Sequence, residues 1–323
     1  MRHLGRSLAA PFAGALLAGC SLTVPITRPT PSGPSFSDAT ARPATLAVLD
    51  ERAGDETQFH VLTGGLAHAK VSLEGIDSPI AFLAESLGKE FAARGYPVHV
   101  TTDRSAASDL QLHVKRYRIV SRRSSGFAPW ESMHQFAGTL TARSLSRDIY
   151  AYFYNGKFPV WSMKEVFEPC YDTPASILVK EIASKVNHAM LGFRSGDTVV
   201  ADLAKKAAPK DDQDNGPSWE ILELGGTNNP AAMEILKRYA AHKDEFVRAC
   251  SFSAIGMLGP ERELAFLKER YAALRSMDKY MALAAIGDAG DADSLAFVKS
   301  QMGDPLYHDE PGMQYVVDLY SGR

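Results

Sequence analysis

The sequence predicts two folded domains: an α+β domain whose antiparallel-rich sheet carries two helices on one face, followed by a small all-α array of helix pairs. Strand-like and helix-like segments follow one another between residues 45 and 204. From residue 219 to residue 323 a similar line of sequence recurs every 31 residues. A chain of 323 residues is long enough to bury two separate cores, which agrees with this division.

The strands and helices of the α+β domain are predicted from local sequence patterns. Residues 45–50 form an apolar run that indicates a buried strand, and "PVHVT" and "SDLQLHVKRYRIV" alternate in the manner of strands. A helix is expected from Ser78, a good N-cap, through Pro79 in its first turn to Gly95 at its end. The line "PASILVKEIASKVNHAMLGF" predicts a second amphipathic helix that closes the domain.

A hairpin is expected around the dipeptide Asn155-Gly156, because Asn-Gly is the strongest two-residue turn signal. Such a turn places Tyr152 opposite Pro159 and Tyr150 opposite Trp161, on one face of the hairpin. Aromatic side chains with polar ends suit contact with a partner protein, and they also suit cover by another part of the same chain. Both alternatives are open, and the candidate partner-contact residues on this face are Tyr150, Tyr152 and Trp161.

The 31-residue repeat predicts stacked helix pairs. Its copies are Trp219–Lys237, Cys250–Lys268 and Met281–Lys299. In each copy an apolar helical stretch ends at Asn or Gly, and a second helix restarts one or two residues later. Helix pairs of this kind cannot bury their apolar faces alone, so they stack on their neighbours. One further period falls on Val316, which suggests a final half-repeat that caps the stack.

Positions that differ between copies of the repeat are free of the common packing demand. Met257 stands where the next copy has Asp288, and Arg262 stands where the next copy has Asp293. These four residues are therefore further candidates for contact with a partner.

Two resemblances to known families follow from these segments. The lines "VLDERAGD", "FLAESLGKEFAARGY", "SDLQLHVKRYRI" and "ILVKEIASKVNHAM" resemble the YajG family of small bacterial lipoproteins over residues 45–203. The line "EFVRACSFSAIGMLG" and its copies resemble short HEAT-like repeats of the phycobilisome-lyase type. The first resemblance implies binding or scaffolding without catalytic residues, and the second implies a short HEAT-like solenoid over residues 219–323.

The N-terminus has the pattern of a lipoprotein signal. Residues 1–19 combine two arginines with a short apolar core, and "LLAGC" resembles the lipobox in which Cys20 receives acyl chains. Ser21 is not the aspartate of inner-membrane retention, which favours the outer membrane and a periplasm-facing, lipid-anchored protein. A soluble secreted protein with a chance "LAGC" is the alternative. The chain has no apolar run long enough to span a bilayer.

Two segments read as linkers. Residues 20–44 hold the lipidated cysteine and five prolines, which indicates a tether reaching ~80 Å when extended. Residues 205–218, "KKAAPKDDQDNGPS", indicate a linker between the α+β domain at 45–204 and the repeats.

Charge limits the partners. The part from Trp219 onward has 11 basic and 16 acidic residues, which disfavours nucleic acid. The run "KRYRIVSRRS" suits either an anionic glycan, lipopolysaccharide or headgroup, or the solvated end of a strand. Its candidate residues are Lys115, Arg116, Arg118, Arg122 and Arg123.

No catalytic, metal or cofactor site is predicted. The S-x-x-K strings at Ser86 and Ser276 lack the accompanying K-T-G or S-D-N element, and the histidines are scattered singly. Cys170 and Cys250 are expected to be buried apolar side chains rather than a disulfide. We therefore expect a non-catalytic protein that binds another envelope protein; the alternatives are an activator or enzyme of peptidoglycan metabolism, or a glycan- or lipid-binding transport accessory.

Overall fold

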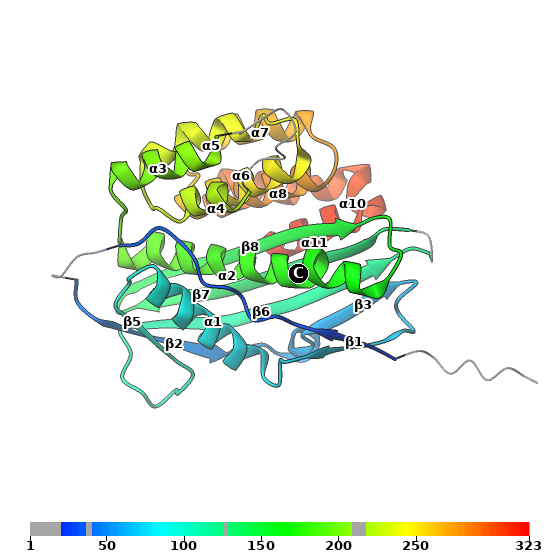
Figure 1. Ribbon diagram of the computed structural model, residues 1–323, viewed down its shortest axis with the longest axis horizontal. Helices are drawn as coiled ribbons and strands as arrows, with labels where there is room; N and C mark the ends of the chain where they lie inside the picture. The colour runs from blue at the N-terminus through cyan, green and yellow to red at the C-terminus, as the bar shows by residue number, and fades with distance from the viewer. Residues whose placement is uncertain (1–20, 37–40, 126–127, 209–217, 323) are drawn as a thin grey trace, which may run out of the picture.

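The N-terminal half of the protein is built on a mixed sheet. The computed structural model describes residues 21–36, 41–125, 128–208 and 218–322, so the predicted signal peptide and Cys20 lie outside the described residues. Five strands follow one another across the sheet in the order β5-β2-β6-β7-β8, and β3 pairs with the end of β6 (Figure 1). The strands are β2 (Ala44–Asp50), β3 (His60–Gly64), β5 (Val98–Thr101), β6 (Leu110–Arg123), β7 (Trp130–Ala142) and β8 (Leu145–Lys157).

The sheet combines parallel and antiparallel pairs. The long strands β6, β7 and β8 are antiparallel neighbours, whereas β2 pairs in parallel with β5 and β6, and β3 pairs in parallel with β6. The expected antiparallel character therefore holds for the three longest strands, and the complete sheet is mixed.

The hairpin prediction was wrong. The β7–β8 turn lies at Arg143-Ser144, where Arg143 has φ +52°, and β8 runs extended through Asn155 and Gly156. The Asn155 side chain donates to the Pro169 carbonyl at 2.8 Å, and this long-range bond holds the dipeptide in the strand. Arg143-Ser144 is not a dipeptide that favours a two-residue turn, so local turn preferences predicted the turn at Asn155-Gly156 instead.

Two helices pack on one face of the sheet, as predicted. They are α1 (Pro79–Ala93) and α2 (Thr173–Val186), and they share an apolar core with β2, β6, β7 and β8. The Ser78 hydroxyl accepts a hydrogen bond from the Ala81 amide, and Gly95 after the helix has φ +73°, which glycine adopts readily. Short helical turns at Gly54–Thr57, Met163–Val166, Glu168–Asp172 and Asn187–Leu191 complete the domain.

The predicted tether is largely part of the fold. Residues 21–25 form β1 (Ser21–Pro25), which pairs in parallel with β4 (Lys70–Glu74). Val24 is fully buried, and the Phe36 ring lies 4.7 Å from that of Phe193. The sequence "LTVPI" places apolar residues at every second position, and this strand pattern outweighs the surrounding prolines. Residues 21–25 therefore do not serve as an extended tether, and the predicted reach of 24 extended residues was wrong.

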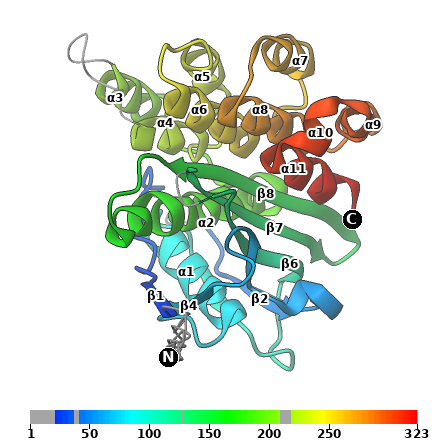
Figure 2. The same ribbon diagram turned by 90° about the vertical axis from the view of Figure 1, so that its right-hand side faces the viewer.

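The C-terminal part is helical and lies over the sheet domain (Figures 1 and 2). Its helices are α3 (Asp197–Ala207), α4 (Ser218–Gly225), α5 (Met233–Tyr239), α6 (Glu245–Leu258), α7 (Leu264–Ala273), α8 (Met277–Asp288), α9 (Ala292–Ser300), α10 (Pro305–Asp309) and α11 (Pro311–Ser321), with 3₁₀ turns at Pro230–Ala232 and Gln301–Gly303. Helix α3 packs on α4, so the helical region begins before the predicted boundary at residue 204. The first three residues of the predicted linker, 205–207, belong to α3. None of the helices in the described ranges is both long and apolar enough to cross a membrane.

The repeat correctly predicted where helices end. Asn228, Gly259 and Gly290 follow the first helix of each copy and all have positive φ, at 50°, 94° and 69°. Val316 is buried within α11, in the final half-repeat.

The repeated "LAFLK" line is a packing device. Leu267 and its counterpart Val298 are fully buried. Lys237 lies over the ring of Phe266 at 5.2 Å, and Lys268 lies over the ring of Phe297, one repeat further on, at 4.8 Å. Successive copies therefore make the same lysine–aromatic contact with the next pair.

Three glycines spaced by 31 residues allow the first helices of successive copies to approach closely. A Cβ atom added to Gly225 would lie 2.6 Å from the Cα atom of Ala254. One added to Gly256 would meet the Asp288 carboxylate, and one added to Gly287 would meet the Tyr320 ring. The absence of a side chain at these positions sets the spacing of the stack.

Replacing Gly287 by alanine is expected to lower the free energy of unfolding by about 1–3 kcal/mol, because the new methyl group overlaps a buried ring. Urea titration measures this change. Gly303→Ala is the matched control, since nothing lies within 4 Å of a Cβ atom there. Equal stability of the two variants would show that the stack is free to expand at Gly287.

Candidate functional site

The tyrosines of β8 face the chain's own helical region. The Tyr150 ring lies 4.8 Å from that of Tyr320, and the Tyr152 hydroxyl donates to the Gly312 carbonyl at 2.9 Å. Tyr152 is completely buried. Tyr150 and Tyr152, predicted as candidate partner contacts, are therefore part of an internal interface. Of the two alternatives, cover by the same chain is the correct one.

Trp161 is not covered by the described residues. It follows the end of β8, and its side chain is 83% exposed. The predicted pairing with Tyr150 does not occur, because β8 continues beyond the expected turn. Of the three predicted aromatic contacts, Trp161 alone remains available to another molecule.

Of the four repeat positions predicted to contact a partner, two have buried side chains and two are exposed. Met257 is 1% exposed and belongs to the helical core, and Asp288 is buried against Lys185 of α2. Those two predictions were wrong because helices α6 and α8 pack against the sheet domain rather than facing solvent. Arg262 and Asp293 are exposed and remain candidates for partner contact.

The basic run on β6 is not a continuous exposed patch. Arg116 makes a bidentate pair with Glu56, at 2.8 and 2.6 Å, and Arg118 donates to Gln135 at 2.7 Å. Glu56 comes from the segment that precedes β3. Its position beside β6 is set by a distant part of the chain, which the local charge pattern could not reveal.

The remaining basic residues of the run follow the same trend. Arg122 pairs with Glu131 at 3.1 Å, and Arg123 donates to the Ala128 carbonyl at 3.0 Å. Lys115 is 58% exposed and lies 4.0 Å from Asp148. Because acidic partners accompany most of these cations, the arrangement favours the strand-end interpretation over an anion-binding surface.

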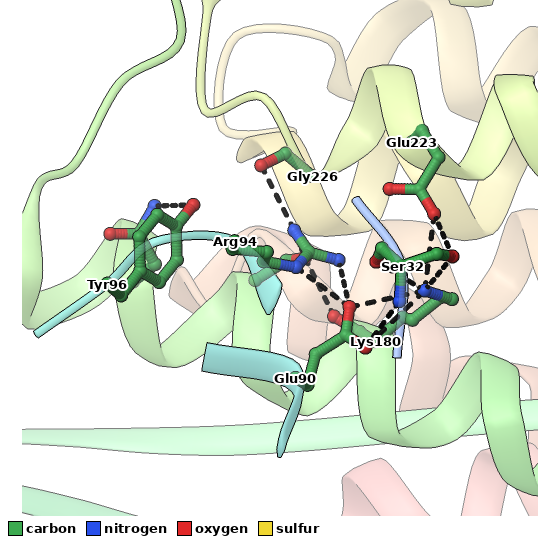
Figure 3. A network of polar contacts seen from close by, with 9 residues as sticks. Ser32, Glu90, Arg94, Tyr96, Lys180, Glu223 and Gly226 are labelled. Carbon is green, nitrogen blue, oxygen red and sulfur yellow. Dashed lines mark hydrogen bonds and ion pairs between the residues drawn. The ribbon is translucent and has the colours of Figure 1, made fainter. Parts of the chain in front are cut away.

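A first charged network, formed by Glu90, Arg94, Lys180 and Glu223, joins α1, α2 and α4 (Figure 3). Arg94 Nε donates to Glu90 at 2.8 Å, and its Nη1 donates to the Gly226 carbonyl at 3.2 Å. Lys180 lies 3.2 Å from both Glu90 and Glu223. Two acidic and two basic groups balance one another in the interior, which is the condition for burying charge at modest cost.

The N-terminal segment takes part in this network. Ser32 Oγ donates to Glu223 at 2.7 Å, and the Lys180 ammonium donates to Ser32 Oγ at 2.6 Å (Figure 3). Residues near Ser32 are therefore held between α2 and the first repeat helix. The network therefore connects four parts of the chain that are distant in sequence: the segment around Ser32 and helices α1, α2 and α4.

A second charged network, formed by Glu181, Lys185, Asp288 and Tyr320, joins α2 to α8 and α11. Lys185 Nζ donates to Asp288 at 2.7 Å, to Glu181 at 3.1 Å and to the Tyr150 carbonyl at 2.7 Å. The Tyr320 hydroxyl donates to the other oxygen of Asp288 at 2.7 Å.

This second network contains two carboxyl groups but one ammonium group. Burial raises the pKa of Glu181 to about 7 and also raises the pKa of Asp288. Burial alone lowers the pKa of Lys185, but the attraction of Asp288 and Glu181 outweighs it and the net shift of the Lys185 pKa is upward. Lys185 is therefore the charged member, and Glu181 is the group that takes up or releases a proton near neutrality.

A cleft of about 690 Å³ opens beside the second network, between β8, the end of α2 and the turns that end the first helices of two repeat copies. His188 lies at its wall, 2.9 Å from the Asn228 amide oxygen and 3.6 Å from Glu261. The neighbouring Glu261 carboxylate raises the pKa of His188. The lining mixes both signs of charge; its acidic and basic residues are Arg147, Asp148, Lys185, His188, Glu261, Asp288 and Asp291.

In the described part of the chain, the histidine at the wall of the cleft is not paired with a nucleophile. His188 contacts an amide and a carboxylate, whereas nucleophilic catalysis requires a hydroxyl or thiol beside the base. Within the described ranges no group of three histidine, cysteine or acidic side chains is placed to hold a metal ion.

The S-x-x-K strings do not form acyl-serine sites. Ser86 is buried, whereas Lys89 points outward and pairs with Glu85 at 2.8 Å. The Lys279 ammonium lies 3.3 Å from the Tyr271 carbonyl oxygen and 4.1 Å from the centre of the Tyr271 ring. In both strings the lysine is held by groups other than the serine.

The two internal cysteines are as expected. Cys170 and Cys250 are buried, and neither forms a disulfide with another described residue. Burial raises the pKa of Cys170 to about 12, so this thiol is unreactive at neutral pH.

Comparison with known proteins gives no relative: no protein-family model, no curated protein and no solved structure matches this chain.

Proposed function

We propose that the protein is a lipid-anchored, periplasm-facing protein of the bacterial outer membrane that binds another envelope protein without catalysing a reaction. In this proposal the sheet domain is YajG-like, the helical region is a short HEAT-like solenoid, and the two act as one rigid scaffold. Acyl chains on Cys20 supply the membrane anchor.

The proposal rests on the buried ion pairs between the sheet domain and the helical region. The charged side chains buried between the sheet domain and the helical region contact one another and fix the two parts together. A preorganised body of this kind loses little conformational freedom on binding a partner, which favours a scaffolding role.

The outer edge of the helical region is the best candidate binding surface. Arg262 and Asp293 occupy equivalent positions in two copies of the repeat, are exposed and carry opposite charges. Opposite charges at a fixed spacing recognise a surface with the complementary arrangement.

Photo-crosslinking in cells tests this surface. A crosslinking residue at Arg262 or Asp293 is expected to capture one envelope protein, whereas the same residue at Lys89, which is 48% exposed on α1, is expected to capture none or different ones. Identical products from all three positions, or products containing only lipid or glycan, would defeat the protein-scaffold proposal.

Metabolic palmitate labelling tests the anchor separately. The wild-type protein should incorporate label, and Cys20→Ala should abolish it. Unchanged labelling of the variant would remove the lipoprotein part of the proposal and leave the crosslinking result standing on its own.

A further inference from the structure

One end of the sheet domain gathers the start of β1 and the ends of three strands. β3 and β6 run in parallel and end together, since Gly64 pairs with Arg123. β8 runs in the same direction, and its last residue, Lys157, pairs with the first residue of β7. We call this end of the molecule the Ser21 end.

The N-terminus of the described chain lies at the Ser21 end. The turn after β3 leads directly into β4, and the first residue of β4, Lys70, pairs with Ser21. Figure 1 shows the beginning of β1 and the end of β8 toward the same side of the molecule. The residue that follows the predicted lipidated cysteine is therefore fixed beside the loops at this end.

An exposed pair of aromatic side chains projects from the same end. In the segment 158–162, which we call the aromatic loop, Phe158 is 65% exposed and Trp161 is 83% exposed. The neighbouring residues hold the loop in place: Val160 packs on an apolar cluster, and Glu165 accepts hydrogen bonds from the Trp161 amide and the Ser162 hydroxyl, at 3.3 and 3.4 Å.

We propose that the aromatic loop inserts into the headgroup region of the membrane to which the chain is anchored. This inference rests on the proposed lipidation of Cys20, because acyl chains one residue before Ser21 hold the Ser21 end at the bilayer surface. Tryptophan is enriched at membrane interfaces, where its ring meets hydrocarbon and its N–H meets water. The aromatic loop thereby supplies a second point of contact beside the acyl chains.

The contact fixes how the protein stands on the membrane. Leu145 begins β8 and Lys157 ends it, so these residues lie roughly 40 Å apart along a strand of 13 residues. With the Ser21 end against the bilayer, Leu145 and the β7–β8 turn that precedes it lie at the end of the sheet away from the membrane. The charges near the loop balance, with Lys157 and Lys164 against Glu165 and Glu168, so insertion depends little on salt or on anionic lipid.

Quenching of tryptophan fluorescence by brominated lipids tests the proposal. The mature chain from Ser21 onward, with a hexahistidine tag in place of Cys20, is held on vesicles of phosphatidylethanolamine and phosphatidylglycerol that contain a nickel-chelating lipid. The quenched fraction is expected to fall severalfold in Trp161→Phe and to persist in Trp219→Phe. Trp130 is 2% exposed and should not be quenched.

A matched control uses the opposite end of β8. Leu145 is also an exposed apolar residue, at 59%, so Leu145→Trp in the Trp161→Phe background places a new tryptophan far from the expected membrane contact. This tryptophan should remain unquenched. Equal quenching of wild type and Trp161→Phe, or quenching of the Leu145→Trp probe, would overturn the proposal.

The tag makes this test independent of lipidation. Palmitate labelling with an unquenched Trp161 would keep the lipoprotein proposal and refute membrane insertion. Absent labelling with a quenched Trp161 would refute the lipid anchor and keep the loop as a membrane-binding surface. Unchanged circular dichroism of the variants confirms that substitution of these exposed side chains preserves the fold.

Discussion

Replacing Arg94 by methionine is expected to lower the free energy of unfolding by about 3–5 kcal/mol, because it removes one partner from a buried set of charges. Arg94 is completely buried and bridges Glu90, Ser184 and the Gly226 carbonyl. Without it, Glu90 and Glu223 share the single cation of Lys180, so one negative charge is left uncompensated in the interior.

Chemical denaturation measures the free energy of unfolding of Arg94→Met. Lys89→Met, on helix α1, which ends just before Arg94, is the matched control. Lys89 is about half-exposed and pairs with Glu85, so its loss should cost less than about 1 kcal/mol. Adding Glu90→Gln to Arg94→Met should recover part of the stability, since the uncompensated carboxylate is removed as well. A loss of under 1 kcal/mol for Arg94→Met would contradict the view that the network holds the two domains together.

Loss of the Arg94 guanidinium should also weaken the attachment of the helical region to the sheet domain. Gly226 follows α4, so the Arg94 guanidinium connects the sheet domain to the first repeat helix. Cooperative unfolding of the wild type and separate unfolding of the two parts in Arg94→Met would be consistent with this role.

Local sequence signals were reliable where local interactions decide the structure. Ser78 caps α1 as expected, and the 31-residue spacing of Gly259 and Gly290 marks the helix ends. In both cases a backbone requirement within one turn selects the residue type. Element type and repeat boundaries could therefore be read from the sequence.

The same signals failed where distant contacts decide. Asn155-Gly156 has the composition of a turn, but a bond from Asn155 to Pro169 keeps it in a strand. The segment 21–36 has the composition of a tether, but pairing with β4 and contact with Lys180 order it. Neither partner is visible from the segment itself.

The buried networks could not be predicted for a related reason. Every residue of α2 from Ile177 to Val186 is buried, although Lys180, Glu181 and Lys185 read as the solvent face of an amphipathic helix. Their partners lie on α1, α4 and α8. Glu90 is 90 residues from Lys180 in the sequence, and Asp288 is 103 residues from Lys185. Only the packing of the helical region over α2 converts this polar face into an internal interface.

Replacing Glu181 by glutamine is expected to stabilise the protein above neutral pH and to change its stability little below pH 4.5. Burial raises the pKa of Glu181 from its ordinary value of 4.5 to about 7. Between these values the folded protein keeps a proton that the unfolded chain has lost. The contribution of Glu181 to stability therefore falls as pH rises from 4.5 to 7, by an amount on the order of 2–3 kcal/mol.

The groups that face Glu181 determine this result. They are Lys185 on the same helix, Asp288 on α8, Tyr320 on α11 and Ser253 on α6. With Glu181 ionised, two carboxylates share one ammonium group, whereas glutamine leaves the neutral pair of Lys185 and Asp288. The variant should therefore gain most at pH 8.

The quantity to measure is the difference in unfolding free energy between Glu181→Gln and wild type, by urea titration at several pH values from 4.5 to 8. The total pH dependence is less informative, because burial lowers the pKa values of His60 and His134 to about 4 and these groups act in the opposite direction. Glu234→Gln, at a carboxylate that is 81% exposed on α5, controls for removing a surface charge. A difference for Glu181→Gln that stays constant across this range would show that folding does not raise the pKa of Glu181, so that Lys185 supports both carboxylates at once.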